Sequence, residues 1–170
     1  AKLKCFSIIK KKFMNYYILV ISIFSVLIDQ VSKGLINSYL GHPGFLRLTK
    51  YLSLETTYND GAAWNILSGN QIFLITISLI ILVIVYSMMY QLKKTKVTNF
   101  AFGILIGGIF GNLIDRIFQG SVTDFIRIDL PFYNFPIFNI ADICIVIGVF
   151  ILIIESIRKD IKNDSRSRKH

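Results

Sequence analysis

Residues 111–142 read GNLIDRIFQGSVTDFIRIDLPFYNFPIFNIAD and place carboxyl and amide side chains between two apolar stretches. Asn112 and Asp115 are three residues apart near the end of the first stretch, and Asn139 and Asp142 repeat this spacing at the start of the second. Asp124 lies in the connection between them. Because ionisable groups are costly in a hydrocarbon environment, their presence here predicts a functional site.

The rest of the chain is too apolar for an ordinary soluble domain. Of its 170 residues 54% are hydrophobic, the mean hydropathy is +0.59, and the apolar residues come in long blocks. We therefore expect an all-α membrane protein with four transmembrane helices, at about 13–28, 72–90, 100–114 and 140–157. The whole chain is expected to form a single membrane domain, composed of a basic leader at 1–12, a four-span core at 13–158 and a basic tail at 159–170.

The positive charge is concentrated in three places. The net charge is +9, and 14 of the 19 basic residues lie before the first expected span, between the second and third, or after the fourth. The positive-inside rule places all three clusters, and with them both ends of the chain, in the cytoplasm. Since the clusters flank membrane spans and lack interleaved aromatic residues, we expect no nucleic-acid partner.

Two segments on the outer side of the membrane show a strand pattern. Leucines alternate with other residues within 41–58, and apolar and polar residues alternate within 121–130. We expect a small outer β element from the first segment and a second extended strand from the other. Residues 62–67 are expected to form a short helix at the membrane interface, with Trp64 as its anchor.

Two spacings within the expected helices predict packing. Gly103, Gly107 and Gly111 recur every fourth residue, so a neighbouring helix can approach this face closely. Asp29 and Lys33 are four residues apart and share a helix face. Taken alone, that pair also fits a solvated helix end with a surface ion pair, because the first span is expected to reach the outer boundary near Asp29.

The expected topology places all of these polar residues at one depth, near the outer interface. Two carboxylates close together cannot both ionise easily, so one retains a proton near neutral pH. Such a pair supplies a general base for water and a general acid for a carbonyl, which is the chemistry of an aspartic hydrolase. Spacing alone leaves two pairs open, Asp124 with Asp142 and Asp115 with Asp142. No metal or cofactor is expected, and the only histidines, His42 and His170, argue against a Ser-His-Asp triad.

Three other functions are less well supported. A proton-coupled transporter also uses carboxylates in the membrane, but its sites usually lie near the midplane and in broken helices. A Ser-Lys peptidase is disfavoured because Ser32 and Lys33 are neighbours that cannot face one another on a helix. A purely structural membrane protein leaves the polar group unexplained.

Five short motifs carry a resemblance to a known family. They are D-Q-x-x-K at 29–33, N-x-G-A-A-W at 59–64, G-N-L-I-D-R at 111–116, V-x-D-F at 122–125 and F-N-x-A-D at 138–142. In these motifs and their order the chain resembles the lipoprotein signal peptidases (signal peptidase II), membrane aspartyl peptidases of bacteria. The resemblance extends from Ile28 to Glu155.

The resemblance implies an activity and a set of site residues. Members of this family cut signal peptides from prolipoproteins, on the N-terminal side of a cysteine that already carries diacylglycerol. Their catalytic aspartates belong to V-x-D-F and F-N-x-A-D, which correspond to Asp124 and Asp142 here. The other motif residues are expected to bind substrate or brace the site: Asp29, Lys33, Asn59, Gly61, Trp64, Asn112, Asp115, Arg116 and Asn139.

The resemblance also implies the partners and the compartment. We expect diacylglyceryl prolipoproteins as substrates, contact with membrane lipids, a monomeric enzyme, and a site near the outer face of the bacterial cytoplasmic membrane. The chain departs from the family pattern at Tyr58, where many members have Arg, and at Asn65, where Gly is common. Both positions belong to the segment expected to cover the substrate.

Overall fold

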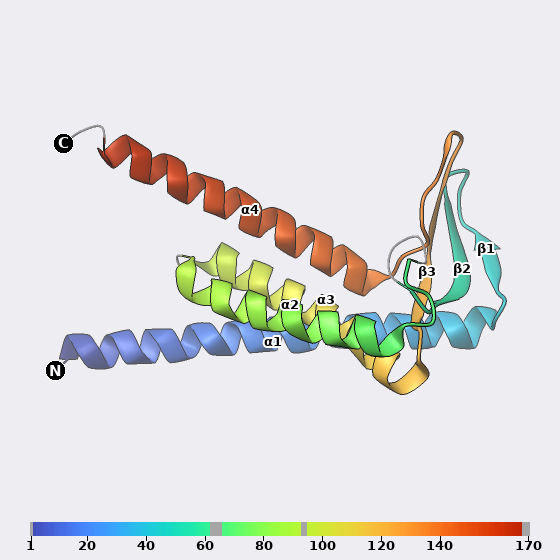
Figure 1. Cartoon of the computed structure of the whole chain (residues 1–170), viewed down its shortest axis with the longest axis horizontal. Helices are drawn as coiled ribbons and strands as arrows, with labels where there is room; N and C mark the ends of the chain where they lie inside the picture. Colours follow the sequence, from blue (N-terminus) through green and yellow to red (C-terminus); the bar gives the residue numbers. More distant parts are fainter. Residues whose placement is uncertain (1, 62–65, 93–94, 168–170) are drawn as a thin grey trace.

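A computed structural model describes residues 2–61, 66–92 and 95–167 of the chain. Four long helices dominate it: α1 (Lys2–Leu40), α2 (Gln71–Gln91), α3 (Lys96–Gln119) and α4 (Ile140–Ser167). Each contains a stretch long and apolar enough to cross a membrane, so the four predicted spans are confirmed. The start of α1 and the end of α4 lie at one end of the molecule, and a small sheet lies at the other (Figure 1).

Helix α3 is the centre of the bundle. In its candidate span 72% of the residues are buried, against 28% or less in the other three spans. A Cβ atom added at Gly103 or Gly107 would lie 2.6 Å from a side-chain atom of Ile21 or Ser25 on α1. The predicted glycine face is therefore confirmed, because these residues let the α1 backbone approach α3 closely.

Helix α1 is longer than the sequence predicts. It continues past Asp29 to Leu40 and ends at Gly41, whose φ of 68° is the left-handed conformation that often terminates helices. Asp29 and Lys33 are 0% and 3% exposed, so the alternative of a solvated helix end with a surface ion pair is wrong. The apolar pattern stops near Ile28 because the following turns carry polar side chains that face protein instead of lipid.

The sheet has four antiparallel strands in the order β1 (Phe45–Arg47), β2 (Leu52–Asn59), β3 (Val122–Leu130) and β4 (Tyr133–Asn134). The two segments predicted to be extended are confirmed as strands. They pair with each other through β2 and β3, which the sequence did not reveal. Thr57 is opposite Asp124 in this register, next to an irregularity between Leu54 and Thr57.

The two faces of the sheet differ in chemistry. On β3, Val122, Asp124 and Ile128 face the helices and a cleft described below. The alternate residues face away, where Arg127 Nε donates to Asp129 Oδ1 at 2.8 Å. Hydrogen bonds from Ser53 and Arg127 hold the pKa of Asp129 below its usual value. The period-two alternation of β3 thus separates an ion-paired surface from the face that borders the cleft.

Two other expectations concern the connections and the ends. Most of the interfacial helix predicted at 62–67, including Trp64, lies outside the described residues, and Ile66 and Leu67 lie in a turn. Helix α1 begins at Lys2 and helix α4 continues to Ser167. The described residues of the basic leader and tail are therefore continuous with these two helices.

Candidate active site

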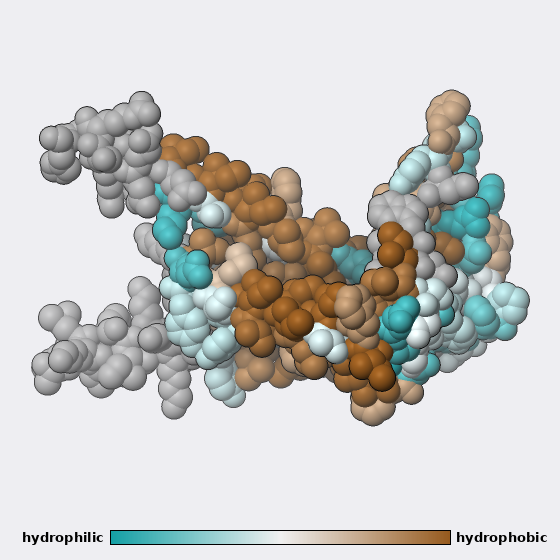
Figure 2. Space-filling model, viewed as in Figure 1, coloured by the Kyte–Doolittle hydropathy of each residue, from teal (hydrophilic) through white to brown (hydrophobic). Residues whose placement is uncertain are grey.

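An apolar cleft lies between α2, α3 and α4 and reaches the sheet. Its volume is about 1020 Å³, and it is lined mainly by aliphatic side chains such as Ile81, Val85, Leu105, Ile109 and Val149. Along α4 the lining extends from Asp142 to Ser156, which is about 20 Å of helix at roughly 1.5 Å per residue. Figure 2 shows hydrophobic surface along the helices and hydrophilic residues gathered on the sheet and near the opposite end.

The polar residues of the cleft are gathered at the end that meets the sheet. Asp124 on β3 and Asp142 in the first turn of α4 both line this end, together with Asn59, Asn112 and Arg116. Asp124 is 2% exposed, whereas Asp142 is half-buried. The fold therefore brings two carboxyl groups from different elements to one end of one apolar cavity.

Asp124 receives a side-chain amide donor on each oxygen. Asn139 Nδ2 donates to Asp124 Oδ1 at 2.6 Å, and Asn59 Nδ2 donates to Oδ2 at 3.0 Å. Burial, together with the neighbouring charge of Asp142, raises the pKa of Asp124 to about 7, although these two hydrogen bonds and the charge of Lys33 act in the opposite direction. The Asp124 carboxyl group can therefore hold a proton near neutral pH.

Asp142 is oriented by the beginning of α4. Asn139, directly before the helix, accepts from Asp142 N at 3.0 Å through Oδ1, and its own backbone N donates to Asp142 Oδ2 at 3.2 Å. This is a capping box, in which two helix-terminal N–H groups are satisfied reciprocally. Asn112 Nδ2 donates to the other oxygen, Asp142 Oδ1, at 2.7 Å. The N-x-x-D spacing seen in the sequence is thus a helix start that orients a carboxylate.

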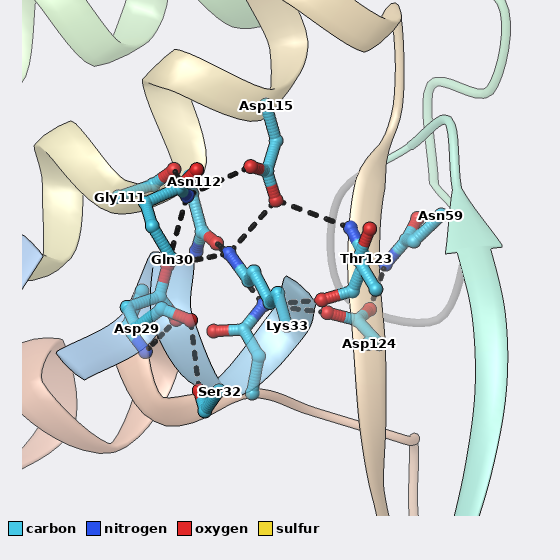
Figure 3. Close-up of polar contacts among 12 residues, drawn as sticks. Asp29, Gln30, Ser32, Lys33, Asn59, Gly111, Asn112, Asp115, Thr123 and Asp124 are labelled. Carbon is cyan, nitrogen blue, oxygen red and sulfur yellow. Dashed lines mark hydrogen bonds and ion pairs between the residues drawn. The ribbon is translucent and has the colours of Figure 1, made fainter. Parts of the chain in front are cut away.

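A second polar group lies beside the cleft; we call it the ion cluster and define it as Asp29, Gln30, Lys33 and Asp115. Its three charged members are buried, and Gln30 is half-buried. Lys33 Nζ is 2.7 Å from Asp29 Oδ2 and 2.8 Å from Asp115 Oδ2 (Figure 3). Asp29 and Asp115 are both 0% exposed. Of the two pairs that the spacing left open, the structure groups Asp124 with Asp142 in the cleft and groups Asp115 with Lys33.

The ion cluster holds the backbone next to each carboxyl group of the cleft. Asp29 Oδ1 accepts from Ala141 N at 2.8 Å, one residue before Asp142. Asp115 Oδ2 accepts from Thr123 N at 3.2 Å, one residue before Asp124. Asp29 and Lys33, for which spacing alone also allowed a surface ion pair, are therefore part of a buried connection between α1, α3, β3 and α4.

Gln30 is a member of this cluster that the sequence reasoning did not select. Its Nε2 donates to Asp115 Oδ1 at 2.8 Å and to the Gly111 carbonyl at 3.1 Å. On a helix, Gln30 does not share the Asp29–Lys33 face, so spacing could not reveal it. Its position inside the D-Q-x-x-K motif was the available signal.

The end of β2 and the residues directly after it lie beside Arg116 at the same end of the cleft. Asn59 Oδ1 accepts from Gly61 N at 3.0 Å, and Arg116 Nη2 donates to the Gly61 carbonyl at 3.2 Å. Within the described residues, the buried Arg116 Nε has no hydrogen-bond partner. Asn59, Gly61 and Arg116 are thus brought together as expected, whereas Trp64 lies outside the described residues.

Comparisons with known proteins point in one direction. The sequence signature of the signal peptidase (SPase) II family matches residues 21–158. Lipoprotein signal peptidases from Francisella tularensis subsp. mediasiatica (strain FSC147) and subsp. holarctica (strain OSU18) are each 40% identical to this chain over 150 residues, covering 85% of it and 92% of the relative.

Solved structures agree in fold. A bacterial membrane enzyme determined by the in meso method at 2.3 Å resolution has a TM-score of 0.77 and 36% identity, over 86% of this chain and 90% of that chain. A second, at 1.9 Å resolution, has a TM-score of 0.72 and 37% identity, over 81% of this chain and 90% of that chain. With a family signature over most of its length and relatives of this similarity, the chain belongs to the signal peptidase II family of aspartic membrane peptidases.

Proposed function

We propose that this protein removes signal peptides from diacylglyceryl-modified prolipoproteins by cutting before the lipidated cysteine, with Asp124 and Asp142 as its catalytic pair. The observation that carries the proposal is the meeting of these two carboxyl groups at the polar end of a long apolar cleft. The neighbouring carboxyl groups of Asp29 and Asp115 instead share the ammonium group of Lys33.

The two carboxyl groups support acid–base hydrolysis. Asp124, with a pKa of about 7, carries the proton and polarises the scissile carbonyl. Asp142 is the general base and takes a proton from the attacking water. When the tetrahedral intermediate collapses, Asp142 gives this proton to the leaving amine and Asp124 regains its own, so the peptide bond breaks with no covalent enzyme intermediate.

The neighbouring polar residues bind the substrate or hold the catalytic pair in place. Asn112, Asn139 and Asn59 orient the pair through the amide hydrogen bonds described above. Arg116 lines the cleft and has an unused guanidinium N–H, which suits a substrate carbonyl. Gly61 holds Arg116 through its carbonyl oxygen, and we assign the segment containing Trp64 to covering the substrate.

The cleft suits an apolar substrate that enters from the membrane. Its aliphatic lining covers about 20 Å of the roughly 30 Å hydrocarbon core, which is enough for the apolar part of a signal peptide and for acyl chains. The basic ends of the chain lie opposite the sheet (Figure 1). We therefore place both termini in the cytoplasm and the catalytic pair near the outer face of a bacterial cytoplasmic membrane. In this membrane the enzyme is a monomer that consists of one domain.

A transporter is the weaker alternative. Its carboxylates are expected near the membrane midplane and in broken helices, whereas α3 and α4 are continuous helices and the carboxyl pair lies where they meet the sheet.

The test is cleavage of a diacylglyceryl-modified prolipopeptide by the purified protein in detergent, beside the same peptide without lipid. Cleavage before the lipidated cysteine is expected to resist a metal chelator and to be absent from the unlipidated peptide. Wild-type protein with a cooperative unfolding transition that leaves the lipidated peptide intact would overturn the proposal.

A further inference from the structure

The side-chain amide of Asn112 lies between the ion cluster and the catalytic pair. Its Oδ1 accepts from Lys33 Nζ at 3.2 Å and from Asn139 Nδ2 at 3.0 Å. Its Nδ2 donates to Asp142 Oδ1 at 2.7 Å. Figure 3 shows the Lys33 ammonium group between the side chains of Asp29, Asn112 and Asp115. One amide thus connects a buried cation with a catalytic carboxylate.

Lys33 and Asn139 together fix which way this amide points, because both donate to Asn112 Oδ1. An ammonium group only donates hydrogen bonds, so it requires an acceptor opposite it. If the Asn112 amide were flipped, its NH₂ would face the Lys33 ammonium group, donor against donor, and its oxygen would face Asp142 Oδ1. In the observed orientation both oxygens of Asp142 accept a hydrogen bond, which suits a carboxylate.

The amide of Asn139 is oriented by a different element. Its oxygen accepts from Asp142 N at the start of α4, which leaves its NH₂ group facing Asp124. The helix start therefore orients the amide that faces Asp124. Lys33 reaches Asp142 through the Asn112 amide, and it acts on Asp124 through its charge.

We propose that Lys33 is a positioning residue that, by holding Asn112 Oδ1, directs the Asn112 N–H to Asp142 and keeps Asp142 as the ionised member of the pair. The proton of the pair then stays on Asp124. The inference rests on the proposed function, because it assigns the two roles within that catalytic pair.

The charged and titratable groups around the pair are few. Helix α3 contributes Arg116, which interacts electrostatically with both aspartates, and Asp115. Helix α1 contributes Asp29 and Lys33, which contact each other at 2.7 Å. Helix α4 contributes Cys144, which lies near Asp29, and β3 contributes Asp124. Lys33 is the cation that contacts Asn112, so its removal acts on Asp142 most directly.

A double variant separates this contact from the overall charge of the ion cluster. Lys33→Met with Asp115→Asn removes one cation and one carboxylate, so the formal charge of the cluster stays at the wild-type value. Asp115→Asn alone is the matched control, because it retains the cation on Asn112. The measurement is the pH dependence of kcat/KM with a diacylglyceryl prolipopeptide, each profile normalised to its own maximum so that a loss of folded enzyme does not move it.

In the double variant the acidic limb of the profile is expected to move to higher pH by about one unit relative to wild type, whose ion-cluster charge it matches. The limb of Asp115→Asn is expected at or below that of wild type. Lys33→Gln, a second variant without the charge, is expected to move the limb in the same direction as the double variant. Superimposable limbs in the double variant and wild type would overturn the inference.

Failure of the proposed function is recognised separately. Asp124→Asn is introduced into the wild-type protein and into Asp115→Asn, and both resulting variants are expected to be inactive. Cleavage by either variant would refute the assignment of the catalytic pair itself. Inactive Asp124→Asn enzymes with unmoved limbs would refute only the role of Lys33.

Discussion

The ion cluster and the catalytic pair each contain two aspartates in neighbouring parts of the fold, yet the aspartates differ in partners and in surroundings. Asp29 and Asp115 share the cation of Lys33 and have no exposed surface. Among the described residues, the hydrogen bonds to the carboxyl groups of Asp124 and Asp142 come from neutral amide and backbone donors, and both aspartates line a cleft of about 1020 Å³. A buried carboxylate that is paired with a cation is held as a structural anion, whereas one held by amides beside a cavity can exchange a proton.

The difference also explains why the two groups are adjacent. A catalytic carboxylate must keep a fixed orientation without a cation that would hold it permanently ionised. Here the ion cluster supplies the rigidity through Ala141 N and Thr123 N, the backbone groups that precede Asp142 and Asp124. Lys33 has its hydrogen-bonded path to Asp142 through the Asn112 amide, and its charge also acts on Asp124.

The largest expected effect is the loss of cleavage in Asp142→Asn. The variant retains an oxygen for Asn112 but loses the general base, so kcat is expected to fall at least about a thousandfold, with little change in thermal stability. Asp129→Asn is the matched control, an aspartate on the sheet face that points away from the cleft, and it is expected to retain activity. Comparable losses in both variants would contradict the distinction between the two sites.

Lys33→Met is expected to have the largest effect on stability. It leaves Asp29 and Asp115 buried without a cation, and breaking a buried ion pair costs on the order of 3–5 kcal/mol. Thermal unfolding in detergent measures the loss. Arg127→Gln, which removes an exposed ion-paired cation on the sheet, is expected to cost at most about 1 kcal/mol. Equal losses in the two variants would show that the cluster is not the stabilising group.

The pH dependence of stability is expected to distinguish Asp124. Its pKa of about 7 in the folded protein exceeds the 3.8 of the unfolded chain, so the folded state binds more protons between these values. Wild-type stability attributable to this group therefore falls as pH rises through that window. The melting temperature of Asp124→Asn relative to wild type is expected to rise from about pH 5 to about pH 8. A constant difference would mean that Asp124 is ionised throughout.

A smaller effect is expected from Gly111→Ala at the contact of the ion cluster with α3. The added Cβ would lie 2.7 Å from Asp29 Oδ2 and 3.1 Å from Ala141 Cβ, and such overpacking costs about 1–3 kcal/mol. Gly34→Ala on α1 is the control, because nothing lies within 4 Å of its Cβ position. It is expected to be neutral or to stabilise by about 0.5–1 kcal/mol. Thermal unfolding of the two variants shows whether the close approach of Asp29 to Gly111 contributes to stability.

The sequence predicts those parts of the fold whose environment is uniform. Spans that face lipid are continuous apolar runs, and β3 shows its two faces as an alternation, so both were recognised. The outer end of α1 was not recognised. In the sequence, a helical turn whose polar side chains face the protein interior cannot be distinguished from a helix end that is exposed to water. Asp29 and Lys33 therefore appeared to be a surface pair.

The candidate site was only partly visible in the sequence. Local spacing revealed the helix start at Asn139 and Asp142, since a capping box is formed within four residues. The grouping of Asp124 with Asp142 depends on the pairing of β3 with β2, which no local pattern specifies. Gln30 was missed for a similar reason, since its partners are on α3 and lie more than eighty residues away along the chain.

The most direct test of the separation between catalytic pair and ion cluster measures cleavage and thermal unfolding together for Asp124→Asn and Asp115→Asn. Asp124→Asn is expected to be inactive. At neutral pH its melting temperature is expected to be equal to or higher than that of wild type. Asp115→Asn is expected to retain measurable cleavage with a lower melting temperature, because it weakens the contacts to Lys33 and Thr123 N. The reverse pattern, an active Asp124→Asn and a stable but inactive Asp115→Asn, would contradict the assignment and would make Asp115 the partner of Asp142.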